Sequence, residues 1–148
     1  MVPPIPIQDR PRAFLILFNL TFENEDLIIE ALRAAGYLGS AGNKELALIG
    51  DTVLRLHLQV EGRARGMNRG SIDAMIQRLA CNGNLTNRGF ELGIDAYIQN
   101  NPSQGNTISP GLMATTVEAI IGAVFLDKNR DLAAVEPIIA LFGLGWAE

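Results

Sequence analysis

The chain has 148 residues, of which 48% are hydrophobic, and its formal net charge is −4. This length and apolar content fit one globular domain and exclude an intrinsically disordered protein. The acidic balance counts against strong autonomous nucleic-acid binding, because basic residues that neutralise phosphates supply most non-specific affinity. The single cysteine, Cys81, excludes an internal disulfide and fits a reducing compartment.

No targeting or membrane segment is apparent. The apolar run Phe14–Phe18 is short, and no run approaches the roughly 20 residues that a membrane helix needs. The first residues, with several prolines and Asp9, do not resemble a secretory or transit peptide. We therefore expect an intracellular protein, cytoplasmic or mitochondrial, that is neither secreted nor bound to a membrane.

The N-terminal segment is rich in proline, with Pro3, Pro4, Pro6 and Pro11. Proline lacks a backbone N–H and disfavours helix in the residue before it. We therefore assign residues 1–24 to an extended arm and residues 25–148 to a single helical domain.

Apolar residues recur at helical spacing from Glu25, and Gly36 supplies a stop. Asn43 is the expected N-cap of a second helix that runs to about Glu61. One apolar stripe of this helix is formed by Leu46, Ile49, Val53, Leu56 and Val60. Leucines on its other faces predict a helix that is buried almost all round, with Asp51 pointing away from the stripe.

The remainder also has the three-to-four spacing of helices. A Gly- and Arg-rich loop is expected at 62–70, and a helix after it breaks at 82–84. Further helices are expected at about 85–93, 112–126 and 131–142, the last one kinked or restarted at Pro137. No stretch alternates with the period of a strand, so the predicted fold class is all-α with about seven helices.

Two segments carry a resemblance to a known family: Asn43–Asp51, with the sequence NKELALIGD, and Ala114–Asp127, with the sequence ATTVEAIIGAVFLD. They resemble the two signature helices of the ribonuclease III family. The resemblance extends over about residues 27–142 and implies an RNase III endonuclease-like helical domain. It also implies carboxylates that hold Mg²⁺ or Mn²⁺ against double-stranded RNA, and a dimer. We expect no C-terminal double-stranded-RNA-binding domain in this chain.

The family's acidic ligand positions are only partly kept. By resemblance, Asp51 and Glu118 take the catalytic and metal-binding roles. Three other positions where the family has acids hold Lys44, Ala47 and Thr115. Two carboxylates form a poor cage for magnesium, which prefers several oxygen ligands.

Asp51 also has a purely structural interpretation as one half of an ion pair. Its partner is expected to be Arg55, one turn later, or Lys44, two turns earlier. We favour a charge cluster of Lys44, Asp51 and Glu118 that replaces the metal.

Three arginines, Arg63, Arg65 and Arg69, fall in the predicted loop and are candidate RNA-binding residues. Arg69 also stands where the family has a further acid. A solvated loop without ligand explains them equally well.

The sequence therefore supports two main hypotheses. The first is an RNase III-like protein, catalytically impaired, that acts in RNA processing or RNA–protein assembly, as family members in mitochondrial ribosomes do. The alternative is a divergent, active, metal-dependent endoribonuclease that cleaves double-stranded RNA. The expected partners are RNA, double-stranded or ribosomal, and a second subunit, in a homodimer or in a heterodimer with a related chain.

Overall fold

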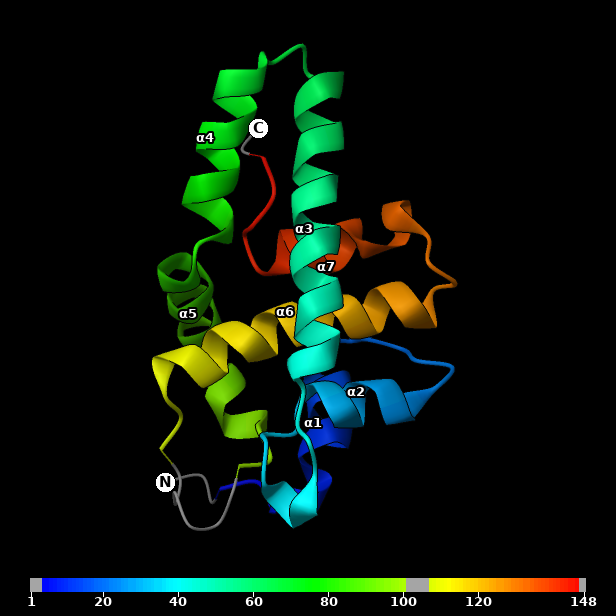
Figure 1. Cartoon of the computed structure of the whole chain (residues 1–148). Coiled ribbons are helices and arrows are strands. Elements are labelled where there is room, and N and C mark those ends of the chain that lie inside the picture. Colours follow the sequence, from blue (N-terminus) through cyan, green and yellow to red (C-terminus); the bar gives the residue numbers. More distant parts are fainter. Residues whose placement is uncertain (1–3, 101–106, 147–148) are drawn as a thin grey trace.

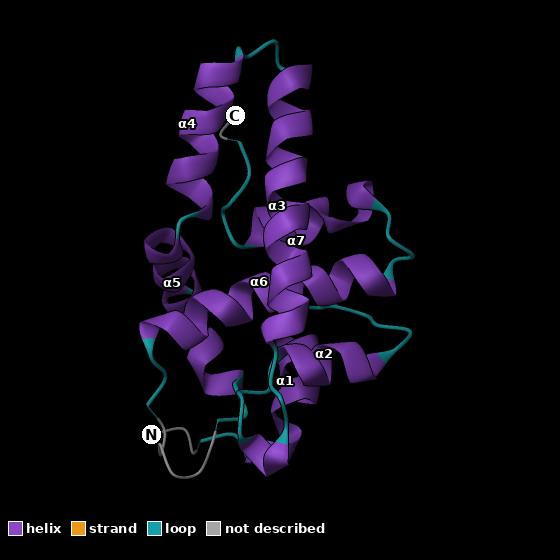
Figure 2. Cartoon of the chain, in the orientation of Figure 1, coloured by secondary structure: helices purple, strands orange, loops and turns teal. Residues whose placement is uncertain are grey.

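A computed structural model describes residues 4–100 and 107–146. Helices joined by loops form this part of the chain, and it contains no strand (Figure 2). The seven α-helices are α1 (Arg10–Leu17), α2 (Glu25–Ala31), α3 (Lys44–Ala64), α4 (Arg69–Ala80), α5 (Asn82–Glu91), α6 (Pro110–Asp127) and α7 (Glu136–Leu141). Short 3₁₀ helices are η1 (Ile7–Asp9), η2 (Tyr37–Gly39), η3 (Ile94–Tyr97) and η5 (Leu132–Val135). The predicted all-α class is confirmed.

The two longest helices, α3 and α6, cross in direct backbone contact (Figure 1). A Cβ atom added at Gly50 of α3 would lie 1.7 Å from the carbonyl oxygen of Glu118 in α6. A Cβ atom added at Gly122 of α6 would lie 2.3 Å from the carbonyl oxygen of Leu46 in α3. Only glycine lets the two helices approach this closely, so these two positions fix the crossing.

The other helices are arranged around this crossing. α2 and α5 pack against α6, and α4 returns beside the outer half of α3, so that the two form a protruding hairpin (Figure 1). The core extends from α1 to the C-terminal helix. Its fully buried side chains include Phe14, Ile28, Leu54, Ile120 and Phe142.

The N-terminal segment differs from the prediction. It was expected to be extended through residue 24, but Arg10–Leu17 form α1 and bury Phe14 and Leu15. Pro11 lies in the first turn of α1, where the missing N–H breaks no helical hydrogen bond. The proline therefore opens this helix instead of preventing it.

Three other element boundaries can be compared with the prediction. α3 continues to Ala64, and α4 begins at Arg69, so the loop between them is shorter than expected. The break near residue 82 is a single extended residue, Cys81, whose side chain is exposed. The restart at Pro137 is confirmed, because this residue lies in the first turn of α7.

α3 is not buried all round, contrary to the prediction. Its inner face packs on α6, whereas Leu48, Leu56 and Val60 are 71%, 45% and 51% exposed. They lie within about 120° of each other on the opposite face at 100° per residue. We call these three residues the open face of α3. They are exposed because the described helices cover only one side of α3.

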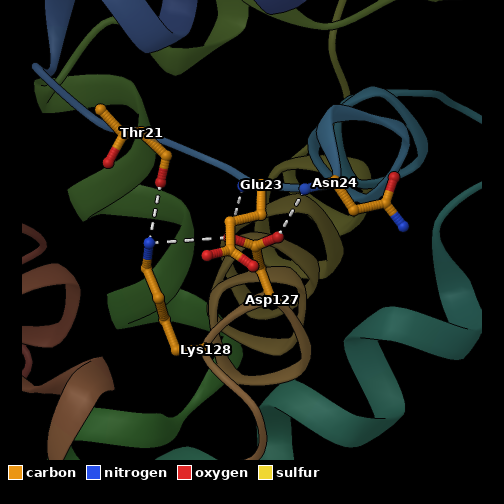
Figure 3. Close-up of polar contacts among 5 residues, drawn as sticks. All are labelled: Thr21, Glu23, Asn24, Asp127 and Lys128. Atoms are coloured by element: carbon orange, nitrogen blue, oxygen red, sulfur yellow. Dashed lines mark hydrogen bonds and ion pairs between the residues drawn. The ribbon is translucent and has the colours of Figure 1, made fainter.

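The C-terminal end of α6 anchors the loop before α2. The Asp127 carboxylate accepts hydrogen bonds from the backbone N–H groups of Glu23, at 3.1 Å, and Asn24, at 2.8 Å (Figure 3). Lys128 lies 3.6 Å from the same carboxylate and donates to the carbonyl of Thr21. The Asp127 side chain is only 1% exposed, so these donors compensate a nearly buried charge.

α6 is a long and strongly apolar helix. It has 18 residues and matches a membrane span in length and composition, contrary to the expectation that no segment would do so. In the folded chain 61% of the helix is buried by other helices, as is usual for a central core helix.

Replacing Gly50 with alanine should destabilise the fold. The new Cβ would overlap the backbone of Glu118, and neither helix can yield as a flexible side chain would. We expect a loss of at least about 3 kcal/mol in the free energy of unfolding, measured by urea denaturation.

The matched control is Gly111→Ala, in the first turn of α6, where an added Cβ meets nothing within 4 Å. It should be neutral or slightly stabilising. Equal effects of the two substitutions would contradict the proposed backbone contact.

Candidate functional site

The helix crossing brings Asp51 and Glu118 together. Asp51 directly follows Gly50, and the Glu118 carbonyl is the atom that Gly50 approaches. Both side chains are half-buried, and their carboxyl groups lie within hydrogen-bonding distance of each other. The two acids that the resemblance selects therefore form one pair at the edge of the contact between α3 and α6.

Arg55 is the cation of this site. Its Nε donates to Oδ1 of Asp51 at 2.9 Å, and its charge also acts on Glu118. Of the two predicted ion-pair partners, Arg55 is therefore the one present. Lys44 is exposed and makes no ion pair within the described part of the chain, so the predicted Lys44–Asp51–Glu118 cluster is wrong.

The direction of helical side chains explains this choice. Side chains on an α-helix lean towards its N-terminus, so Arg55 leans back onto the preceding turn and Asp51. Lys44 is the first residue of α3, and the same rule directs it away from Asp51.

Glu118 has a strongly altered acidity. Desolvation by burial, followed by the hydrogen bond and the negative charge of Asp51, raises the pKa of Glu118 to about 8, while Arg55 lowers it. Glu118 therefore keeps its proton at neutral pH, and the Arg55 guanidinium pairs with the neighbouring Asp51.

The residues around the pair do not fit the acidic metal site of the family. Ala47 is 6% exposed and offers no ligand atom. The Thr115 hydroxyl donates to the carbonyl of Gly111 at 2.9 Å within its own helix. The described residues contain no group of three His, Cys, Asp or Glu side chains placed to hold a metal ion. Two carboxyl groups beside a guanidinium, one of them with a pKa raised to about 8, are a poor ligand set for Mg²⁺.

The three candidate RNA-binding arginines lie at the other end of α3. Arg63 is in the last turn of α3, and Arg69 begins α4. Both are exposed and line a depression of about 460 Å³, with Met67 and Ile72 among its lining residues. Arg65 pairs with Glu61 at 3.4 Å.

These arginines do not belong to the carboxyl pair. Arg63 lies twelve residues after Asp51, about 18 Å along the helix axis. The structure thus groups the predicted residues into two sites, a carboxyl pair and an arginine cluster.

One structural residue of the site was interpreted incorrectly from the sequence. Asn43 precedes α3 as expected, but its side chain makes no capping hydrogen bond. It is 1% exposed, and its amide donates to the carbonyl of Ala31 and to the hydroxyl of Thr116. Asn43 therefore joins α2, the start of α3 and α6. An asparagine before a helix predicts a cap. No local sequence pattern distinguishes a capping asparagine from one that, like Asn43, bonds to other helices.

The raised pKa of Glu118 predicts a pH-dependent stability. The folded state binds more protons than the unfolded state between about pH 4.5 and pH 8, so the free energy of unfolding should fall as pH rises through this range. In Glu118→Gln the fall should be smaller, as measured by urea denaturation at pH 5, 6.5 and 8.

The second acid with a raised pKa, Glu30, is present in both proteins, and its contribution cancels in the comparison. Parallel pH profiles for the wild type and Glu118→Gln would contradict the protonated pair.

Comparison with known proteins identifies the family. The model of the ribonuclease III domain matches residues 44–129. The chain is 28% identical to Ribonuclease 3 of Bacillus cytotoxicus over 131 residues, covering 81% of this chain and 54% of that protein. It is 32% identical to Ribonuclease 3 of Vibrio vulnificus over 125 residues, covering 80% and 53%. The chain thus spans about half the length of these curated relatives.

A solved structure has the same fold. The nuclease domain of ribonuclease III from Campylobacter jejuni superposes with a TM-score of 0.73 at 20% identity, covering 93% of this chain and 95% of that one. The predicted RNase III-like architecture is confirmed. Because the family model matches more than half of its residues, this chain belongs to the ribonuclease III domain family.

Proposed function

We propose that this protein acts in RNA processing or RNA–protein assembly by binding RNA, without efficient metal-dependent cleavage. The observation that carries this proposal is the carboxyl pair: Asp51 lies beside Glu118 and is paired with Arg55, and the neighbouring ligand positions are Ala47 and Thr115. Hydrolysis in this family depends on several carboxylates that together hold the ion that activates water.

The arginine cluster supports the RNA-binding part of the proposal. Arg63 and Arg69 project from facing ends of α3 and α4 into one exposed depression. Guanidinium groups bind phosphate oxygens through several N–H donors. The net charge of −4 means that such binding is local and moderate in strength.

The open face of α3 supports a dimer. Its side chains, Leu48, Leu56 and Val60, form an apolar surface on a helix that is otherwise central to the fold. The nuclease domain from Campylobacter jejuni, which shares this fold, has a structurally flexible region involved in dimer formation. We propose that the open face is covered by a second copy of this chain.

The first test measures cleavage and binding of labelled double-stranded RNA. The wild type should shift the RNA in a gel without cutting it in Mg²⁺ or Mn²⁺. Arg63→Gln/Arg69→Gln should weaken the shift and lower the salt dependence of log K by about one unit for each arginine.

Asp51→Asn is the matched control, because it alters the carboxyl pair about 18 Å away along α3 and should leave RNA binding unchanged. Cleavage by the wild type that is lost in Asp51→Ala or Glu118→Ala would overturn the proposal in favour of a divergent, active endoribonuclease. If the wild type neither binds nor cleaves RNA, a protein partner becomes the better explanation.

The second test measures oligomeric state by sedimentation equilibrium. The wild type should sediment as a dimer of the 16.0 kDa chain, and Leu48→Asp/Leu56→Asp as a monomer. Burial of a charge in an apolar interface is unfavourable, which is the reason for the expected dissociation.

Leu38→Asp serves as the control, since Leu38 is 80% exposed but lies outside α3. A dimer that persists in the α3 variant would place the interface elsewhere. A monomeric wild type would contradict the homodimer and favour a heterodimer with a related subunit.

A further inference from the structure

Arg55 occupies a particular place in the row of residues that faces the carboxyl pair. Lys44, Ala47, Asp51 and Arg55 follow one another at intervals of three and four along one side of α3. Asp51 therefore has a small, buried alanine on the preceding turn and a guanidinium on the following turn.

The electrostatic surroundings of Arg55 differ from those of an ordinary helix-surface ion pair. The Glu61–Arg65 pair has the same spacing on the same helix and a similar exposure, with the side chains 37% and 34% exposed. Arg55, however, acts on two acids from two helices, because α6 places Glu118 beside Asp51. One fixed cation thus balances the negative charge that would otherwise attract a divalent ion.

We propose that Arg55 is a resident counter-ion that keeps divalent cations out of this site. Consequently, restoring the missing acids alone does not restore tight metal binding. This inference rests on the proposed function, and it adds that the loss of metal binding has two separate causes: missing ligands and an internal cation. Metal binding at this site is therefore weakened by competition from Arg55 as well as by the absence of the family's acidic ligands.

The competition follows from simple electrostatics. A metal ion bound to Asp51 would lie within a few ångströms of the guanidinium, and like charges at this distance repel strongly in a half-buried site. The Asp51 oxygen that accepts from Nε would also have to exchange that hydrogen bond for a metal bond. Both effects weaken metal binding until Arg55 is removed.

The test measures Mn²⁺ binding calorimetrically, without RNA, in a background that restores the missing acids of α3 and α6: Lys44→Glu/Ala47→Glu/Thr115→Asp. Adding Arg55→Gln should tighten Mn²⁺ binding by at least about tenfold. Adding Arg65→Gln instead, which removes the matched ion pair on α3, should leave the affinity unchanged. Paramagnetic broadening of NMR signals should place the ion beside Asp51 and Glu118.

Equal Mn²⁺ affinity with and without Arg55 would overturn the inference, because the side chain would then simply move aside. If Ala47→Glu prevents folding, Arg55→Gln and Arg65→Gln are compared in the natural sequence, and only Arg55→Gln should increase Mn²⁺ broadening at Asp51. Tight binding by the wild type that is lost in Asp51→Asn would also overturn it. Cleavage of RNA by the wild type bears on the proposed function, whereas these RNA-free comparisons bear on Arg55 alone.

Discussion

The backbone contact between α3 and α6 determines the position of everything else in this protein. Two glycines, Gly50 and Gly122, allow each helix to approach a carbonyl oxygen of the other. Any larger residue would separate the helices and move the acids on either side of the contact. Helix packing therefore determines where the carboxyl pair lies, whether or not the pair takes part in a reaction.

This separation of packing from chemistry explains the character of the site. The family model matches residues 44–129, which include both glycines and both retained acids. Around the same contact, two of the family's ligand positions hold side chains that offer no ligand to a metal: Ala47, which is buried in the core, and Thr115, whose hydroxyl donates within its own helix. A chain can thus keep the architecture of a nuclease domain while its acidic site is reduced to two carboxyl groups beside a guanidinium.

Much of the fold could be predicted from the sequence, because helical periodicity is a local property. The restart at Pro137 and the class of the fold followed from such patterns. α1 was missed because a proline was interpreted as a breaker when it lies in the first turn. The open face of α3 was missed for another reason: periodicity identifies the apolar residues, but not which face of the helix the chain itself covers.

The site was less predictable than the fold. The residues Lys44 and Arg55 lie within two turns of Asp51, and only the lean of helical side chains and the position of Glu118 select the arginine. Asn43 shows the same limit, because its partners, Ala31 and Thr116, come from two other helices. Tertiary contacts of this kind leave no spacing signal in the sequence.

The Asp127 anchor has a practical consequence for choosing fragments of this protein. A fragment cut to the family match at 44–129 would contain the nearly buried Asp127 carboxylate but neither of its backbone donors, at Glu23 and Asn24. Of the partners of this carboxylate only Lys128, at 3.6 Å, would remain, and the loss of both backbone donors is unfavourable for a nearly buried charge. The cut would also remove Phe14 and Phe142 from the core. The segment that matches the family model is therefore smaller than the packed core, which extends from α1 to α7, and a fragment meant to keep this core includes both helices.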